Sequence, residues 1–247
     1  MRWTVTKTSL AVSAILACAV PAFAAAAAAA KAPAKTAAPT DLDRVLERFD
    51  RVQDSIHTLS AEFVETTENK LLKEPLSASG TFYLTKPASV MWEYKSPEEM
   101  RFVIDKDLYV GYFPTRKKAE KRDVHRWSDQ IFRFFGLGQG SAELKKFYDI
   151  RTEDPGADMK GSVLLVLDPV KRRVKKRVEE VRMWVDETTL LPVRVQYLGK
   201  DGYVRVIRFH NLKLNPQIAA NVYTVQIPPD FKVTTGFSGF GADKIDR

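Results

Sequence analysis

The sequence predicts an α+β fold in which one antiparallel sheet is covered by a few helices. Apolar side chains recur every three or four residues at the start of the domain, and they then alternate with a period of two. Turn signals follow one another at short spacing, and the long helical crossovers that parallel strands need are missing. Sequential antiparallel pairing is therefore the expected topology.

The composition is that of a globular protein, and it excludes several kinds of site. The chain has 247 residues, of which 45% are hydrophobic and 28% are charged, with a formal net charge of +8. Its one cysteine, Cys18, excludes a disulfide framework, a zinc-finger array and a cysteine-ligated cluster. His57, His125 and His210 are far apart and form no local metal-binding motif, so we expect no metal site, although three separated ligands could still meet in space.

The first 24 residues have the features of a signal peptide. Arg2 and Lys7 precede the short apolar run from Ser9 to Val20, and Ala22-Phe23-Ala24 supplies the small residues of a cleavage site. Cleavage after this motif would give a soluble periplasmic protein. The alternative is a lipobox at Ile15-Leu16-Ala17-Cys18, in which Cys18 would be lipidated and would tether the protein to a membrane.

The remaining chain divides into a linker, one domain and a tail. Residues 25–40 are rich in Ala, Pro and Lys and offer no large side chain to bury, so we expect a flexible linker. Residues 41–235 are long enough for a single domain with a sizeable core. Residues 236–247 are expected to form a C-terminal tail.

The domain is predicted to open with an amphipathic helix. Thr40 is a suitable N-cap, and Asp41 and Asp43 favour the positive end of the helix dipole. The apolar stripe of this helix consists of Leu42, Val45, Leu46, Phe49, Val52, Ile56 and Leu59.

Strands are predicted wherever the apolar period is two. Tight connections are expected at residues 105–107, 186–191 and 199–202. The predicted strands are Gly80 to Thr85, Val90 to Tyr94, Arg101 to Asp105, Leu108 to Phe113, Phe147 to Arg151, Ser162 to Leu167, Val181 to Val185, Val193 to Leu198 and Tyr203 to Phe209.

One short helix interrupts the strands. Ser128 can cap it, and Ile131, Phe132, Phe134 and Phe135 crowd together before the glycine-rich residues 136–140. The segment is either a plug of the core or a movable cover over a cavity, hinged by the glycines.

No pattern in the chain supports catalysis. Gly136-x-Gly138-x-Gly140 superficially resembles a phosphate-binding loop, but it follows a helix instead of a strand and does not start a helix, so we expect no nucleotide site. Glu98-Glu99 and Glu179-Glu180 are adjacent pairs, and adjacent residues of a strand point to opposite faces. We therefore expect no catalytic residue, no cofactor and no enzymatic activity.

The basic run from Lys171 to Arg177 has two interpretations. It is either a solvated loop between strands or an electrostatic patch for anionic lipid headgroups or an acidic protein. Nucleic acid is not an expected partner, because aromatic residues lie at strand-core positions and not beside this run.

A concave sheet face is the candidate binding site. Its side chains either line a cavity for an apolar ligand or fill an ordinary core, and we predict that Trp92 faces a cavity. The residues that could share this face are Phe82, Leu84, Val90, Trp92, Tyr94, Phe102, Ile104, Leu108, Val110 and Tyr112.

Several blocks of sequence resemble the periplasmic outer-membrane lipoprotein carrier family, LolA, over about Asp41 to Val233. The blocks are Leu59-Ser60-Ala61-Glu62-Phe63, Ser79 to Pro87, Met91-Trp92-Glu93-Tyr94 with Ser96-Pro97, Val181 to Asp186, Leu191 to Val195, Asn211 to Asn215 and Val225 to Pro229.

This resemblance implies a strongly curved, unclosed antiparallel barrel with a helical lid. It also implies a monomeric carrier that takes acylated lipoprotein cargo from an inner-membrane lipoprotein-releasing transporter to an outer-membrane acceptor. Alternatives are a carrier of another acylated lipid and a periplasmic sensor of lipoproteins. The expected ligand-binding residues are Phe82, Leu84, Lys86, Val90, Trp92, Tyr94, Ile104, Ile131, Phe132 and Phe135.

The position of Lys86 departs from the family pattern. In the family an Arg at this place, before a Pro, ties the lid shut by hydrogen bonds, and an aromatic residue stands where this chain has Val90. Lys lacks the planar fork of Arg and would hold a lid less rigidly. We expect Lys86 to donate to backbone carbonyls of the Ile131 to Phe135 segment.

Overall fold

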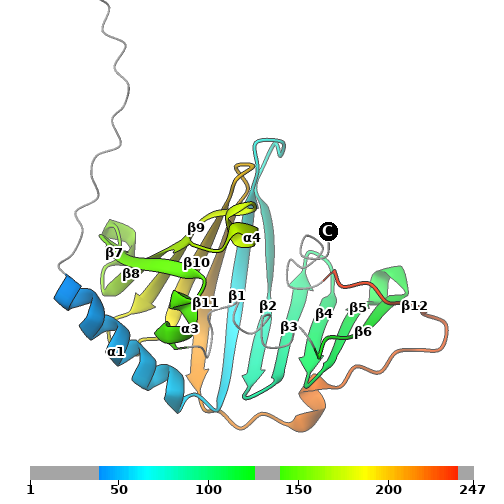
Figure 1. Cartoon of the computed structure of the whole chain (residues 1–247). Coiled ribbons are helices and arrows are strands. Elements are labelled where there is room, and N and C mark those ends of the chain that lie inside the picture. Colours follow the sequence, from blue (N-terminus) through cyan, green and yellow to red (C-terminus); the bar gives the residue numbers. More distant parts are fainter. Residues whose placement is uncertain (1–38, 126–139, 239–247) are drawn as a thin grey trace, which may run out of the picture. The chain divides into compact units, whose positions relative to one another are not determined.

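The structure, a computed structural model, describes residues 39–125 and 140–238, and it contains one sheet of twelve strands (Figure 1). The strand order is β12-β6-β5-β4-β3-β2-β1-β11-β10-β9-β8-β7, so the sheet has two edges and does not close. All pairs are antiparallel except β12 with β6. The predicted fold class is confirmed.

The helices and strands follow in a simple order along the chain. They are α1 (Pro39–Ser55), β1 (Thr58–Glu68), β2 (Leu76–Thr85), β3 (Ser89–Ser96), β4 (Met100–Asp105), β5 (Leu108–Phe113), η1 (Pro114–Arg116), β6 (Lys118–Asp123), α3 (Ser141–Lys145), β7 (Tyr148–Glu153), η2 (Ala157–Met159), β8 (Ser162–Pro169), α4 (Arg172–Lys175), β9 (Val178–Asp186), β10 (Pro192–Gly199), β11 (Val204–Leu214), η3 (Ala220–Tyr223) and β12 (Lys232–Thr234).

Helix α1 differs from the prediction at both ends. It begins at Pro39, inside the predicted linker, so Thr40 is a helical residue and not the N-cap. It ends at Ser55, so Ile56 and Leu59 of the predicted stripe lie beyond it, where they are still buried in the core.

The side chain of Asn215 explains where α1 ends. Its Nδ2 donates to the carbonyl of Ser55 at 2.9 Å, and its Oδ1 accepts from the backbone N–H groups of His57 at 2.7 Å and Thr58 at 3.1 Å. These bonds satisfy backbone groups that a further helical turn would otherwise have paired. A residue that follows β11 therefore sets the boundary between α1 and β1.

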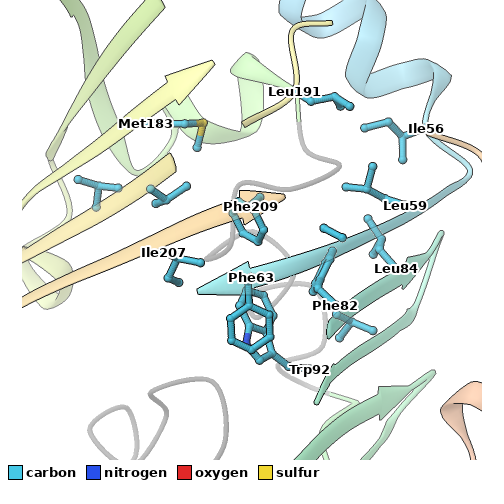
Figure 2. Packing of buried hydrophobic residues seen from close by; sticks show 14 of the residues in the cluster. Ile56, Leu59, Phe63, Phe82, Leu84, Trp92, Met183, Leu191, Ile207 and Phe209 are labelled. Atoms are coloured by element: carbon cyan, nitrogen blue, oxygen red, sulfur yellow. The ribbon is translucent and has the colours of Figure 1, made fainter. Parts of the chain in front are cut away.

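The main core lies on the inner face of the sheet, against the buried side of α1. Figure 2 shows its centre, where Phe63 of β1 lies against Trp92 of β3, near Phe82 and Phe209. The ring centroids of Phe63 and Trp92 are 4.9 Å apart, and those of Phe82 and Trp92 are 4.8 Å apart. One continuous cluster of buried residues reaches across the sheet from β5 to β7 and includes Leu46 and Phe49 of α1.

Strand β5 has the opposite orientation to the one predicted. Its bounds are as expected, but Tyr109 and Phe113 belong to the inner core, so Leu108, Val110 and Tyr112 face the other side. Tyr112 stacks there on Phe231 with ring centroids 5.3 Å apart. The tight turn before β5 sets this orientation, because a shift of one residue exchanges the two faces of a strand.

Strand β6 and helix α4 also differ from the prediction. Strand β6 (Lys118–Asp123) is highly charged and has no apolar alternation, so no sequence signal marked it. Within the basic run 171–177, residues Arg172–Lys175 form the short helix α4 between β8 and β9, where a loop was one of the expectations.

The predicted signal peptide, most of the linker, the Ser128 to Phe135 helix with the glycines that follow it, and the tail from residue 239 lie outside the described residues. Within the described part of the chain, no helix is long and apolar enough to cross a membrane.

Candidate functional site

A cavity of about 410 Å³ opens on the inner face of the sheet. Strands β1 to β5 and β11 all contribute to its wall, and most of the wall is apolar. Its volume falls within the range of small-molecule sites, about 300–1,000 Å³. The lining residues are Glu65, Thr67, Leu76, Ser77, Ala78, Trp92, Tyr94, Pro97, Met100, Phe102, Phe113, Arg205, Ile207 and Ser238.

The predicted binding residues occupy two different places. Trp92 and Tyr94 line the cavity, and Trp92 is only 3% exposed because its ring also packs into the core. The other apolar residues from the described strands are core residues that do not reach the cavity, namely Phe82, Leu84, Val90 and Ile104. Ile131, Phe132 and Phe135 lie outside the described residues.

Lys86 contacts a different helix from the one predicted. Its Nζ donates to the carbonyl of Gln53, in the last turn of α1, at 2.6 Å. Burial lowers the pKa of Lys86, although the nearby carboxylate of Asp54 opposes this shift. The predicted contact with residues 131–135 falls outside the described part of the chain, and the contact that is present is with α1.

Two further polar contacts hold α1 in place. Arg48 donates through Nη2 to the carbonyl of Glu187, in the β9–β10 turn, at 2.9 Å. Asp50 accepts from the backbone N–H of Ser141 at 2.5 Å and from its hydroxyl at 2.6 Å, at the start of α3. Helix α1 is therefore attached to the sheet and to α3 by side chains spread along its length.

The wall of the cavity contains a charged pair that sequence reasoning missed. Nε of Arg205 lies 3.2 Å from Oε1 of Glu65, and the hydroxyl of Tyr94 donates to Oε2 of the same carboxylate at 2.9 Å. Burial and the negative charge of Glu65 both raise the pKa of Tyr94. Burial alone would lower the pKa of Arg205, but the charge of Glu65 outweighs it and the pKa is raised.

A signal for this pair was present in the sequence. Glu65 shares the inward parity of Phe63 along β1, and Arg205 shares that of Ile207 along β11. Charged residues at such positions are rarely buried without a partner.

The C-terminal segment after β12 reaches the same cavity. The carboxylate of Glu120, which is 1% exposed, accepts from the backbone N–H of Ser238 at 2.8 Å and from its hydroxyl at 2.5 Å. Lys118 donates to the same carboxylate at 2.7 Å, and Phe237 packs edge-on against Tyr109. Residues 236–238, assigned to the tail from the sequence, therefore pack against the sheet.

Glu120 is expected to make stability depend on acid pH. Burial alone raises its pKa, but the hydrogen bonds from Lys118 and Ser238 outweigh burial and hold the pKa below its ordinary value of 4.5. The contribution is complete above pH 4.5 and is lost as the pH falls through the lower folded-state pKa. Glu120→Gln should cost about 2 kcal/mol at neutral pH and flatten the loss of stability in acid. Urea unfolding at several pH values measures the stability at neutral pH and its loss in acid, with the exposed Glu99→Gln as the control. If the free energies of unfolding of wild type and Glu120→Gln changed equally with pH, Glu120 would not have this role.

No group of three or more His, Cys, Asp or Glu side chains within the described residues could hold a metal ion. The site consists instead of an apolar cavity, one charged pair and a helix attached across the sheet. An unclosed antiparallel sheet with an apolar cavity on its helix-covered face defines the class of half-barrel proteins that bind apolar ligands.

The chain belongs to the outer membrane lipoprotein carrier protein LolA family, whose sequence model matches residues 54–226. Members of this family are binding or carrier proteins, so the fold indicates a lipid- or lipoprotein-binding role. Among curated proteins, no sequence matches the chain at a significant level.

Solved structures are similar to the chain at low sequence identity, and the first of them shares its fold. An uncharacterised conserved protein from Thermus thermophilus is 15% identical, with a TM-score of 0.50 over 78% of this chain and 98% of its own. A LolA superfamily protein from Nitrosomonas europaea is 11% identical, with a TM-score of 0.40 over 74% and 97% of the two chains. The Pseudomonas aeruginosa MucA/MucB complex gives 13% identity and a TM-score of 0.43 over 78% and 63%.

Proposed function

We propose that the protein is a monomeric periplasmic carrier that binds acyl chains of lipoproteins in the cavity. It collects this cargo from an inner-membrane lipoprotein-releasing transporter and passes it to an outer-membrane acceptor. Membership of the LolA family supports this function. The observation that carries it is the largely apolar cavity of about 410 Å³ on the inner face of an open sheet.

The energetics of acyl chains suit such a cavity. Each buried methylene contributes ~0.8 kcal/mol, so ten methylenes contribute roughly 8 kcal/mol before the costs of binding are subtracted. A carrier must also release its cargo. Helix α1 packs on the same face of the sheet without lining the cavity, and it can move without breaking strand pairs.

Tryptophan fluorescence tests whether the cavity binds an acyl chain. Trp92 lines the cavity, whereas Trp184 belongs to a separate cluster on the outer face and donates to the carbonyl of Pro155 at 2.9 Å. Titrating laurate or a lauroyl ester into the protein should give a saturable change in fluorescence. The change should be largely lost in Trp92→Phe and kept in Trp184→Phe. No saturable change in any of the three proteins would contradict the proposed function.

We also propose that Lys86 controls how readily α1 opens. Lys86→Arg can form a second hydrogen bond and should slow the handover of acylated cargo to acceptor vesicles severalfold. Lys86→Leu removes the bond to Gln53 and should make release faster. Lys95→Leu, an exposed lysine on β3, is the matched control. Transfer at the wild-type rate by both Lys86 variants would mean that this lysine is not a latch.

A further inference from the structure

The cavity combines an apolar wall with one charged pair, and the pair is not explained by stability. Replacing a buried ion pair by apolar residues is often neutral or stabilising, because desolvation offsets the attraction. Phe63 and Ile207, the inward neighbours of Glu65 and Arg205 on the same strands, show that apolar residues fit this face. The charged pair therefore suggests a binding role.

The polar groups are gathered at one part of the wall. Along β1 the inward residues change from Ala61 and Phe63 in the core to Glu65 and Thr67 in the cavity. Along β11 they change from Phe209 and Ile207 to Arg205. The inner face is thus apolar toward the core and polar at Arg205. This division matches a ligand that has an apolar chain and a polar head group.

The guanidinium of Arg205 has N–H donors that make no hydrogen bond to the described residues. It lines the cavity and its side chain is 31% exposed. Its Nε contacts Glu65 and donates to the hydroxyl of Tyr203 at 3.2 Å. Among the described residues, its terminal nitrogens Nη1 and Nη2 have no hydrogen-bond acceptor. Two N–H donors of this planar group can converge on the two lone pairs of one carbonyl oxygen, and the same fork also fits a carboxylate, so the nearby charge of Glu65 decides between the two kinds of head.

We propose that Arg205, held in place by Glu65 and Tyr203, binds the uncharged carbonyl at the head of an acyl ligand. The chain would then lie against the apolar wall formed by Trp92, Met100 and Phe102. Glu65 already neutralises the guanidinium and would repel a second carboxylate, so the head is an ester or an amide and not a free acid. This inference rests on the proposed function, because it assumes that an acyl chain enters the cavity.

Four probes of similar chain length separate the roles of chain and head. Tridecane has no head, laurate has a charged head, methyl laurate has an ester and N-methyl lauramide has an amide. Binding is followed by Trp92 fluorescence. A hydrogen bond from a charged donor predicts that the wild-type protein binds the ester or the amide about tenfold or more tightly than tridecane or laurate. A preference for the amide indicates an N-acylated lipoprotein, and a preference for the ester indicates an ester-linked lipid chain.

Matched variants test whether the preference for an ester or amide head depends on the pair of Glu65 and Arg205. Glu65→Gln with Arg205→Gln removes both charges together, so no single buried charge is left unpaired, and it should bind all four probes alike. Glu93→Gln with Arg101→Gln removes an ion pair of 2.7 Å from the outer face and should keep the preference. Arg205→Lys keeps the charge but loses the planar fork, and should lose most of the preference. Thermal unfolding checks that each variant is folded.

Three outcomes would overturn the inference. Equal binding of methyl laurate, N-methyl lauramide and tridecane by the wild-type protein would remove the role of Arg205 and leave the apolar cavity intact. Tightest binding of laurate would show that a charged head is preferred. Failure of every probe to bind would overturn the proposed function, and this inference with it.

Discussion

Replacing Phe63 with alanine is expected to lower the free energy of unfolding by about 3–5 kcal/mol. Its side chain is 1% exposed and lies at the centre of the inner face. Its ring is 4.9 Å from that of Trp92 and 5.1 Å from that of Tyr94. Removing the ring would leave a void on the inner face, beside the rings of Trp92 and Tyr94, that the paired strands cannot close.

Urea unfolding with a matched truncation tests this expectation. Phe231→Ala deletes the same group from a partly buried position on the outer face, where the ring stacks on Tyr112. It should cost about 1 kcal/mol, because much of that ring is already in contact with water. Equal losses for the two variants would mean that the core is not centred on Phe63.

Introducing a side chain at Gly80 is expected to cost about 3 kcal/mol. A Cβ at this position would lie 1.8 Å from the backbone oxygen of Glu93 and 2.9 Å from Cζ of Phe63. Gly80 therefore allows β2 and β3 to approach each other and leaves room for the Phe63 ring. Because the closer conflict is with backbone, Gly80→Ala must shift the strand pairing itself.

The two sites allow a sharper test in combination. Phe63→Ala removes the conflict with the ring but not the conflict with Glu93, so it should not rescue Gly80→Ala in the double variant. Ser79→Ala, at the neighbouring position of β2, is the control and should change stability by less than about 1 kcal/mol. Thermal or urea unfolding of all four variants measures these effects. Wild-type stability for Gly80→Ala would contradict the close approach of β2 and β3.

The sequence predicted most elements because their apolar periods are clear, and the differences have physical causes. The stripe from Leu42 to Val52 continues in period through Ile56 and Leu59, so nothing local marks the end of α1 at Ser55. That end depends on the side chain of Asn215, about 160 residues along the chain. A contact between distant segments cannot be found from periodicity.

Strand β5 shows a second limit. Both of its faces carry apolar side chains, because the chain from residue 215 to 231 covers the outer face near β3, β4 and Tyr112. Alternation then does not show which face is inward. Val110 and Tyr112 were predicted on the inner face, and they lie on the outer one. Strand β6 is the opposite case, since a charged strand gives no apolar period at all.

The candidate site was predicted in outline only. The alternating residues of the concave face predicted either a cavity or a filled core, and Trp92 and Tyr94 line the cavity that is present. The charged pair of Glu65 and Arg205 was missed. Glu65 lies in β1, which was not among the predicted strands, and in the predicted strand Tyr203 to Phe209 the charged residue Arg205 was not assigned to the inner face. Whether Phe82, Leu84, Val90 or Ile104 contact a ligand stays a prediction, and in this structure they are core residues.

Native mass spectrometry of the protein purified from cells tests the central claim most directly. If the cavity carries acyl chains, a fraction of the protein should retain a bound acylated molecule, and delipidated protein should take up one lauroyl ester. Ala78 of β2 lines the cavity, and the indole of the variant Ala78→Trp would occupy it. This variant should lose the bound species while remaining folded. Protein that carries no acylated molecule in any preparation, and takes up none after delipidation, would contradict a carrier function.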